Sequence, residues 1–451
     1  MEQQASAPSL PSWALIAATI VTLAAIAFPF VRAKNKHAQF LFAALTLRYL
    51  LSAYHQVTYQ PLIAGLSINA MASIAVFAAG LALIPPRRLV LKALAPVYLL
   101  IGAIVVSGAI NPDLSLFADA LVKWGYFLVI LICAREAAKD MGVGALSAFL
   151  LFVFVPPAAF QALSVVLHVA KLTEADGAVS YIGGYNHEAA FSIVALTAMV
   201  LAGLAVSLPA WRRYAIMAAC LVSLYLTNYR TAILAAAPLL LFAVIDAAQP
   251  FRKADRRIVV LGMGAIGLCG LCAAGWLLRE RFSDFGAFLR AGGLPDSPSA
   301  FTAADRQLFS SRLYLWSQYL DAYGRGDLTH LVFGAGPEAW EGRFVTYAHN
   351  TLISTLYEYG VAGALALLLL WGRMIALAAA IADPDLRWKM IAAHSSVIVL
   401  NMSTMAQWLI EGLILYALVC GATMLMARKT APAPAAPRSR AHPALAVRLV
   451  R

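Results

Sequence analysis

The chain has 451 residues, of which 62% are hydrophobic and only 12% are charged. A soluble domain is about half apolar and about a quarter charged, so this composition excludes an ordinary soluble enzyme. The formal net charge of +12 could suit nucleic acid. However, the lysines and arginines lie in short clusters between apolar runs, as they do in membrane proteins, so we expect no nucleic acid partner.

Apolar stretches of about 20 residues recur from Trp13 to Met426, which predicts an all-α, polytopic integral membrane protein with about 12 transmembrane helices. The first stretch indicates a retained helix and no removed signal peptide. The last stretch is too long for one straight crossing and 214–248 is short for two, so kinked or re-entrant arrangements stay open there. The expected spans lie near 13–31, 39–56, 62–84, 93–110, 115–134, 144–169, 188–208, 214–229, 231–248, 258–278, 350–372 and 390–427.

Basic residues alternate from one connection to the next, which is the positive-inside pattern of a polytopic membrane protein. The pattern places the long polar loop at 279–348 on the outer side, which is the periplasm in a Gram-negative cell, and we expect both termini in the cytoplasm. Four regions result: helices one to ten in 1–278, the loop, helices eleven and twelve in 349–429, and a disordered basic tail at 430–451 that touches membrane lipid. The basic connections hold Arg32, Lys34, Lys36, Arg87, Arg88, Lys92, Arg135, Lys139, Arg212, Arg213, Arg252, Lys253, Arg256, Arg257, Arg387 and Lys389.

Ionisable residues inside spans need a reason, because each costs about 2.5–3.5 kcal/mol on insertion scales. Asp119 and Lys123 are four residues apart, which favours a local ion pair. Arg230 falls in a polar break at the outer surface, where its planar guanidinium could anchor lipid headgroups or bind phosphate in a bidentate manner. Arg48 lies deeper in its span and is a weaker candidate for the same work.

The loop contains several local patterns. Ser310 to Leu320 has apolar residues at helical spacing behind two serines, which predicts a helix near the membrane surface. Gly334 and Gly336 predict a tight turn before Pro337. The pair Glu338 and Glu341 is expected on a solvated face, and we expect no metal site and no cofactor.

These motifs together resemble the O-antigen ligase and O-antigen polymerase superfamily. The resemblance rests on an Arg-x-x-x-Trp helix, Gly-x-Gly-Pro, Ala-His-Asn and Glu-x-Gly-x-x-Gly in the second half of the chain. An arginine that opens a helix after a short outer turn adds to it. The matching residues are Arg230, Arg312, Trp316, Gly334, Gly336, His349, Asn350, Glu358, Gly360 and Gly363.

The resemblance implies a glycosyltransferase that acts on sugars linked to undecaprenyl pyrophosphate. We expect transfer of O-antigen polysaccharide to a sugar hydroxyl of lipid A-core, inverting and metal-independent. His349 is the expected general base, and Arg230 and Arg312 are expected to bind the pyrophosphate. Expected substrate-binding residues are Arg48, Asn350, Tyr347, Trp316 and Trp340. Two alternatives stay open: a polymerase that extends the chain on the undecaprenyl carrier, and a membrane transporter, although no repeated halves are visible.

Overall fold

The computed structural model describes residues 8–111, 113–172, 179–247, 258, 261–262, 297–302, 306 and 311–429. Within these ranges the chain is a bundle of long helices with two short two-stranded hairpins, β1 (Pro61–Ile63) with β2 (Leu66–Ser67) and β3 (Lys171–Leu172) with β4 (Val179–Ser180). The predicted all-α class is confirmed. The predicted span at 258–278, apart from residues 258 and 261–262, and the tail at 430–451 lie outside the described residues.

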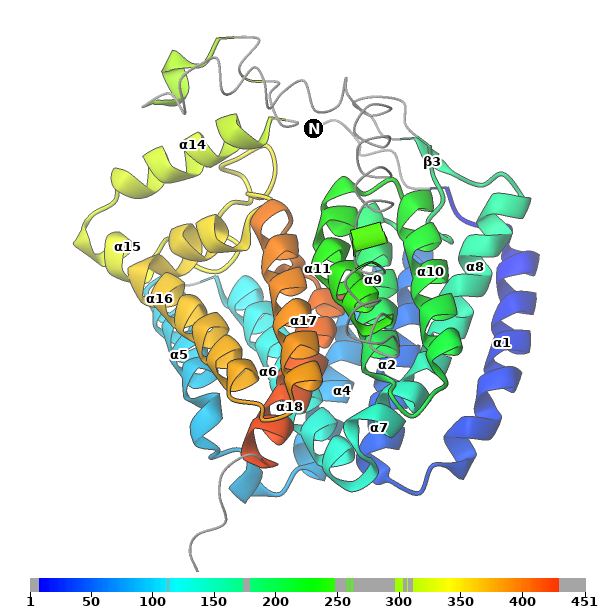
Figure 1. The fold of residues 1–451 in the computed structure, drawn as a ribbon. Coiled ribbons are helices and arrows are strands. Elements are labelled where there is room, and N and C mark those ends of the chain that lie inside the picture. Colours follow the sequence, from blue (N-terminus) through cyan, green and yellow to red (C-terminus); the bar gives the residue numbers. More distant parts are fainter. Residues whose placement is uncertain are drawn as a thin grey trace, which may run out of the picture.

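The helices run side by side along one axis, with α14 and α15 lying across one end of the bundle (Figure 1). Short 3-10 helices connect some of them, including η3 (Leu151–Phe154) between α7 and α8. The α-helices are α1 (Ser12–Arg32), α2 (Lys36–Ala53), α3 (His55–Thr58), α4 (Ile68–Leu83), α5 (Ala95–Ile110), α6 (Leu114–Met141), α7 (Val143–Leu150), α8 (Val155–Val166), α9 (Glu188–Leu204), α10 (Ala210–Leu226), α11 (Arg230–Ala247), α14 (Arg312–Gly324), α15 (Leu328–Phe333), α16 (Thr351–Ala379), α17 (Pro384–Ser403) and α18 (Ile410–Lys429).

Seven segments of the described chain are long and apolar enough to cross a membrane. The chain is thus a multi-pass helical protein, whereas the predicted count of about 12 spans is not confirmed. Other helices are shorter or more polar, such as α4 and α9. The seven segments are Ser12–Arg32, Lys92–Ile110, Leu114–Met141, Val143–Val166, Arg230–Ala247, Thr351–Ala379 and Ile410–Ala427.

The two ambiguous apolar runs each form a pair of helices. The run at 214–248 bends between α10 and α11, where Asn228 adopts a positive φ of 52°. The run at 390–427 breaks between α17 and α18, where Asn401 Oδ1 accepts a hydrogen bond from the backbone N of Gln407 at 3.1 Å. A buried amide that satisfies a free backbone donor makes such a break stable. The broken pair α17 and α18 is thus one of the kinked arrangements that the sequence leaves open for this run.

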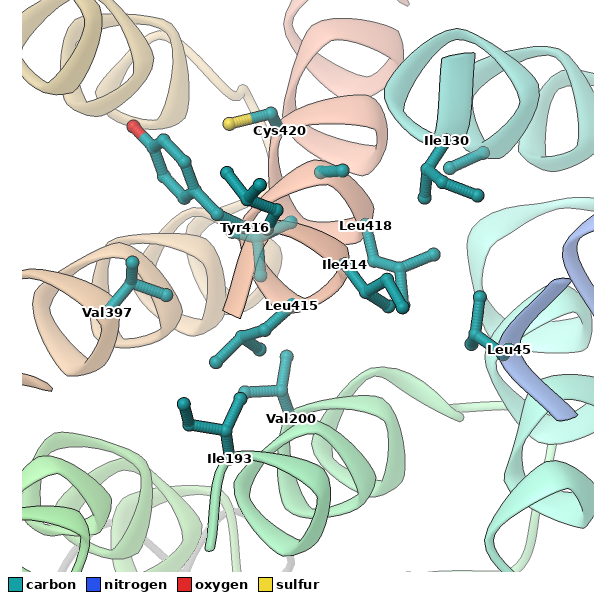
Figure 2. Packing of buried hydrophobic residues seen from close by; sticks show 14 of the residues in the cluster. Leu45, Ile130, Ile193, Val200, Val397, Ile414, Leu415, Tyr416, Leu418 and Cys420 are labelled. Atoms are coloured by element: carbon teal, nitrogen blue, oxygen red, sulfur yellow. The ribbon is translucent and has the colours of Figure 1, made fainter. Parts of the chain in front are cut away.

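Helix α18 forms the centre of the bundle. Figure 2 shows its residues Ile414, Leu415 and Leu418 packed among side chains of α2, α6, α9 and α17. Close approach to α6 depends on Gly421, because a Cβ there would lie 2.6 Å from the carbonyl oxygen of Leu131. Small residues of this kind let membrane helices pack backbone to backbone. This core fixes the positions of the polar elements above it.

The start of α1 and the end of α18 lie at opposite ends of the bundle. Leu10 is next to Gly184, before α9, whereas the Asn35 side chain after α1 donates to Asp140 near the end of α6 at 2.8 Å. Gly421 of α18 lies beside Leu131 and Arg135 in the same half of α6 as Asp140. Residues 1–7 and 430–451 lie outside the described residues, so the predicted cytoplasmic position of both termini stays a prediction. We call the end with Asn35 and Asp140 the basic end and the end that carries α14 the loop end.

Candidate functional site

Helix α14 (Arg312–Gly324) confirms the helix that the loop sequence predicts. Ser311 precedes it with a φ of 64°, and its side chain makes no capping hydrogen bond. Helix α15 then leads into the turn at Gly334, which has a φ of 78°. Both glycines of the predicted tight turn take positive φ, since Gly336 has a φ of 108°. This turn attaches the loop to α16.

Helix α16 contains a kink at Gly360, where φ is 64° and ψ is −167°. A kink leaves carbonyl groups without their helical donors. Here the carbonyl of Tyr357 accepts from the Ala335 N at 2.9 Å, and that of Glu358 accepts from the Gly336 N at 3.0 Å. The hydroxyl of Ser107 in α5 also donates to Glu358 O at 2.7 Å. The two glycine motifs therefore dock the loop onto the bundle.

A buried network of charges lies beneath this junction. The carboxylate of Glu358 accepts from the Glu338 N at 3.0 Å. Glu338 is only 5% exposed, and its carboxylate contacts Lys123 Nζ at 2.8 Å and accepts from the Trp408 indole at 2.9 Å. The expected solvated position of Glu338 is wrong, since Lys123 from α6 compensates its charge. The expected ion pair of Asp119 with Lys123 is confirmed, at 2.6 Å.

His349 sits in a constrained turn immediately before α16. It has a φ of 51°, a conformation that is uncommon outside glycine and asparagine. The Trp316 indole donates to the carbonyl of Ala348 at 2.7 Å, which connects α14 to the turn. Asn350 caps α16 by accepting from the backbone N of Leu352 and Ile353 at 3.0 and 3.1 Å. Trp316 and Asn350 thus hold the turn from both sides.

An aromatic cluster of Trp340, Tyr347 and Trp408 reaches His349 through the Tyr347 ring. The Tyr347 ring lies 4.1 Å from the His349 ring and 5.2 Å from the Trp408 ring, centroid to centroid. Trp340 contacts Tyr347 edge-on at 5.9 Å. The buried His349 Nδ1 and Trp340 Nε1 have no hydrogen-bond partner in the part of the chain that the structure describes. Buried polar atoms normally find one, so these two are free to bind a ligand.

Positive charge gathers around this histidine. Burial, together with the charges of Arg312 and of His187, lowers the pKa of His349 to about 3. Burial and the nearby Tyr229 raise the pKa of the Tyr347 phenol, and Arg312 opposes them. The loop end thus brings Arg312 and His349 together, and the imidazole is neutral at physiological pH.

His187 is a member of this site that sequence reasoning missed. Its Nδ1 accepts from the Ala189 N at 3.0 Å and caps α9, and its ring lies 6.4 Å from the Tyr229 ring. Glu188 beside it pairs with Lys171 at 3.3 Å. The run from Tyr185 to Glu188 is visibly polar in the sequence, but no spacing connects it to a histidine more than a hundred residues away.

Arg230 is the first residue of α11 and is exposed. Its neighbour Tyr229 belongs to the same region, since the Tyr229 hydroxyl donates to Thr404 at 2.6 Å and the charge of Arg312 reaches it. The turn before α11 therefore brings Arg230 to the loop end, where the sequence places it. Its role in substrate binding stays a prediction.

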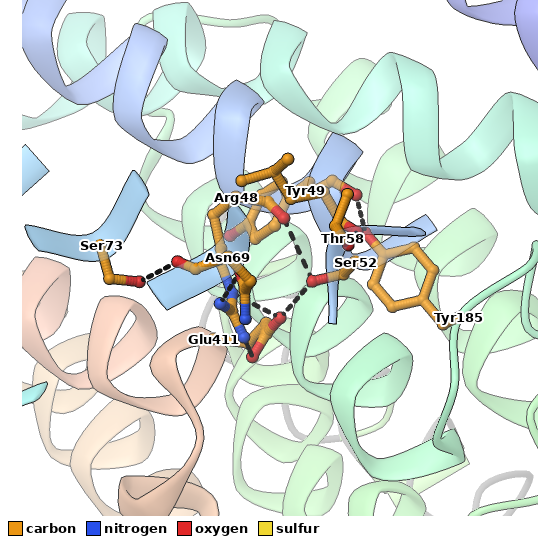
Figure 3. A network of polar contacts seen from close by, with 9 residues as sticks. Arg48, Tyr49, Ser52, Thr58, Asn69, Ser73, Tyr185 and Glu411 are labelled. Carbon is orange, nitrogen blue, oxygen red and sulfur yellow. Dashed lines mark hydrogen bonds and ion pairs between the residues drawn. The ribbon is translucent and has the colours of Figure 1, made fainter. Parts of the chain in front are cut away.

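Arg48 has a different environment from the other predicted site residues. Figure 3 shows its guanidinium against Glu411 of α18, with Nε 2.9 Å from Oε1 and an N–H bond to Oε2 at 3.2 Å. Ser52 donates to the same carboxylate at 2.6 Å, and Asn69 accepts from the guanidinium. Arg48 is 7% exposed. These contacts give it a structural role between helices, and its substrate binding remains untested.

No group of three or more His, Cys, Asp and Glu side chains that could hold a metal ion occurs among the described residues. Metal independence of the reaction stays a prediction.

Residues 215–368 match the family model described as O-antigen ligase. The segment includes Arg230, Arg312 and His349, and it spans the glycine motifs that dock the loop. No curated protein matches the chain. The family resemblance is confirmed, and the match supports a membrane glycosyltransferase of the O-antigen ligase and polymerase family.

Proposed function

We propose that the protein transfers O-antigen polysaccharide from undecaprenyl pyrophosphate to a sugar hydroxyl of lipid A-core. Transfer takes place at the loop end, on the periplasmic face of the bacterial inner membrane. The observation that carries this proposal is that the charge of Arg312 acts on a neutral His349 whose Nδ1 has no hydrogen-bond partner among the described residues. A fixed cation beside a free imidazole suits an anionic leaving group and a hydroxyl nucleophile.

The positive charges bind the donor. Its leaving group is a pyrophosphate, on which negative charge grows as the bond to the anomeric carbon breaks. Arg312 from the loop and Arg230 from α11 supply guanidinium groups that match phosphate oxygens and stay charged at every physiological pH. Charge held in place before the reaction stabilises the transition state without reorganisation, so no metal ion is required.

The transfer itself is a single displacement. The oxygen of the acceptor hydroxyl attacks the anomeric carbon and gives its proton to His349. The bond from that carbon to the pyrophosphate oxygen breaks, and undecaprenyl pyrophosphate leaves with the electron pair. Attack opposite to the leaving group inverts the anomeric configuration.

Binding of the donor also raises the pKa of the general base, His349. In the free protein, burial and the charges of Arg312 and His187 keep the pKa of His349 near 3, which makes the imidazole a weak base. A bound pyrophosphate places negative charge next to Arg312 and offsets its field, so the pKa of His349 rises toward its ordinary value. The base gains strength only when the donor is in place, which suppresses proton transfer in its absence.

The aromatic cluster binds sugar rings. Trp340 and Tyr347 offer apolar faces beside His349, and the free Trp340 N–H can donate to a hydroxyl. Trp316 and Asn350 position the turn, since the Trp316 indole donates to the Ala348 carbonyl and the Asn350 amide donates to the Met402 carbonyl. We propose that sugars next to the scissile bond stack here, which orients the acceptor hydroxyl toward His349.

The test is glycan transfer by purified protein from a pyrophosphate-linked donor to lipid A-core. The His349→Ala protein should lose at least about a hundredfold in kcat, the usual contribution of a general base. His330→Ala is the matched control, because His330 is a loop histidine that pairs with Asp327. Turnover at the wild-type level in folded His349→Ala protein would remove His349 from the mechanism.

Deletion of the gene separates the ligase from its relatives. A strain without the ligase has bare lipopolysaccharide core and accumulates long carrier-linked polymer. Core that carries a single repeat unit would identify a polymerase instead. Normal lipopolysaccharide would contradict both enzymes and favour the transporter.

A further inference from the structure

A cavity lies at the basic end of the bundle, on the opposite side from the loop. It lies between α9, α10, α11 and α17. A contact of Ser207, which lies just before α10, shows that the cavity is at this end. The Ser207 hydroxyl donates to the carbonyl oxygen of Gly144 at 3.0 Å, and Gly144 follows shortly after the end of α6. We call it the basic-end cavity. Nothing in the proposed transfer reaction uses it.

The polar wall of this cavity carries more positive than negative charge. Asp246 at the end of α11 forms ion pairs with Arg213 of α10 at 3.2 Å and with Lys389 of α17 at 3.4 Å. The Tyr214 hydroxyl also donates to Asp246, at 3.0 Å. One carboxylate therefore faces two cations, and the side chains of Arg213 and Lys389 are only 12% and 7% exposed.

A buried cation without a counter-charge destabilises the folded protein, so an anion bound beside it would stabilise this end of the bundle. The Nε of Arg213 is buried and has no hydrogen-bond partner among the described residues. It can therefore donate to a ligand while the Arg213 NH1 stays on Asp246. A guanidinium with a free N–H matches a phosphate oxygen better than it matches water, because the bond is charge-assisted.

The remainder of the cavity wall is apolar, with Leu204, Met217, Leu239 and Phe242 among its residues. A soluble anion would gain nothing from these side chains. An acyl chain would bury hydrocarbon against them, at about 0.8 kcal/mol for each CH₂ group. Basic pockets between transmembrane helices on the cytoplasmic side are suited to the headgroups of anionic lipids.

We propose that the basic-end cavity binds an anionic phospholipid, with its phosphate on Arg213 and Lys389 and an acyl chain along the apolar wall. The lipid would join the first turns of α10 and α17 to the last turn of α11. It would stabilise the bundle at the end opposite to the proposed reaction.

The test measures thermal unfolding of the full chain in neutral detergent, titrated with phosphatidylglycerol or with phosphatidylcholine. Phosphatidylglycerol should raise the unfolding midpoint of the wild type, and phosphatidylcholine should not. Lys389→Gln should weaken the phosphatidylglycerol effect at least about fivefold in lipid concentration, as expected for one lost charge near anionic lipid. Arg213→Gln should do the same.

Arg212→Gln is the matched control. Arg212 adjoins Arg213 but lies over the exposed Trp211 ring at 5.2 Å, away from the cavity. Each cavity variant keeps one cation on Asp246, so the lipid-free protein should fold. Inorganic phosphate should leave the midpoint unchanged, since it lacks an acyl chain. A full phosphatidylglycerol effect in both cavity variants, an equal effect of phosphatidylcholine, or an equal effect of inorganic phosphate would each overturn the proposal.

Discussion

Gly334 and Gly360 interlock where the loop meets α16. A Cβ on Gly334 would lie 2.3 Å from the carbonyl carbon of Glu358, and one on Gly360 would lie 2.3 Å from the carbonyl oxygen of Val332. Both residues take positive φ, which glycine tolerates without strain. The backbones of α15 and α16 can touch only because neither position has a side chain. The chain between them carries His349, so this contact sets the distance between the loop and the bundle.

Alanine at either glycine should separate the loop from α16. Gly334→Ala and Gly360→Ala each add backbone strain of about 1–3 kcal/mol and a steric clash that no side-chain rotation can relieve. Limited proteolysis should cut the 311–350 region faster, and glycan transfer should fall. Gly342→Ala is the control, because Gly342 has a φ of 72° with nothing within 4 Å of an added Cβ. Equal protease sensitivity of all three proteins would show that strain alone, and not the contact, matters.

The helices of this region and the residues Arg312 and His349 could be predicted from the sequence. The buried contacts beneath them could not. Arg312, His349 and the glycine turn follow from local patterns and from the family motif. The burial of Glu338 could not be predicted, because its compensating partner Lys123 lies 215 residues away. The break before α18 depends on Asn401, whose amide looks like any polar residue in an apolar run. A distant partner decided the first case and a specific side-chain hydrogen bond decided the second. Hydropathy contains neither kind of information.

Loss of one partner of the Arg48–Glu411 ion pair should destabilise the protein more than replacement of both partners. Glu411→Gln leaves a buried guanidinium without its counter-charge, which costs about 3–5 kcal/mol in proteins. The thermal unfolding midpoint in detergent should therefore fall sharply, with the transfer reaction lost only where the protein unfolds. Arg48→Met combined with Glu411→Leu should be less harmful than Glu411→Gln alone, because no uncompensated charge remains.

The surface pair of Arg325 with Asp321 provides the comparison, since the Arg325 side chain is 76% exposed. Asp321→Asn should change stability by no more than about 1 kcal/mol. If Glu411→Gln were as mild as Asp321→Asn, the buried pair would not hold α2 to α18. If Glu411→Gln stayed folded but failed to bind donor, Arg48 would regain its predicted place in the substrate site.

The stability of the loop end should fall in mild acid because of His349. Burial, Arg312 and His187 lower the pKa of this histidine to about 3 in the folded protein, against about 6.5 when unfolded. Between these values only the unfolded chain takes up the proton, so stability is lost as the pH falls below about 6.5. The loss is at most about 1.4 kcal/mol per pH unit.

Unfolding midpoints at about pH 7 and about pH 5 check this sign. The His349→Gln protein should lose less stability over this interval than the wild type, and the His330→Gln control should behave as the wild type does. Inorganic pyrophosphate, a probe for the donor headgroup, should reduce the acid loss in the wild type because it offsets the charge of Arg312. An identical acid loss in wild type and His349→Gln would show that His349 titrates normally.

Trp316 should act as a positioning residue for His349. Trp316→Phe removes the indole N–H that holds the Ala348 carbonyl at 2.7 Å, a hydrogen bond worth about 1 kcal/mol. The turn that carries His349 would then sample other orientations, so kcat should fall about fivefold while the KM for the donor stays constant. Trp371→Phe is the control, since the buried indole of Trp371 has no hydrogen-bond partner in the described chain. A rise in the KM for the donor with kcat unchanged would place Trp316 in substrate binding, as the family resemblance implies, and not behind His349.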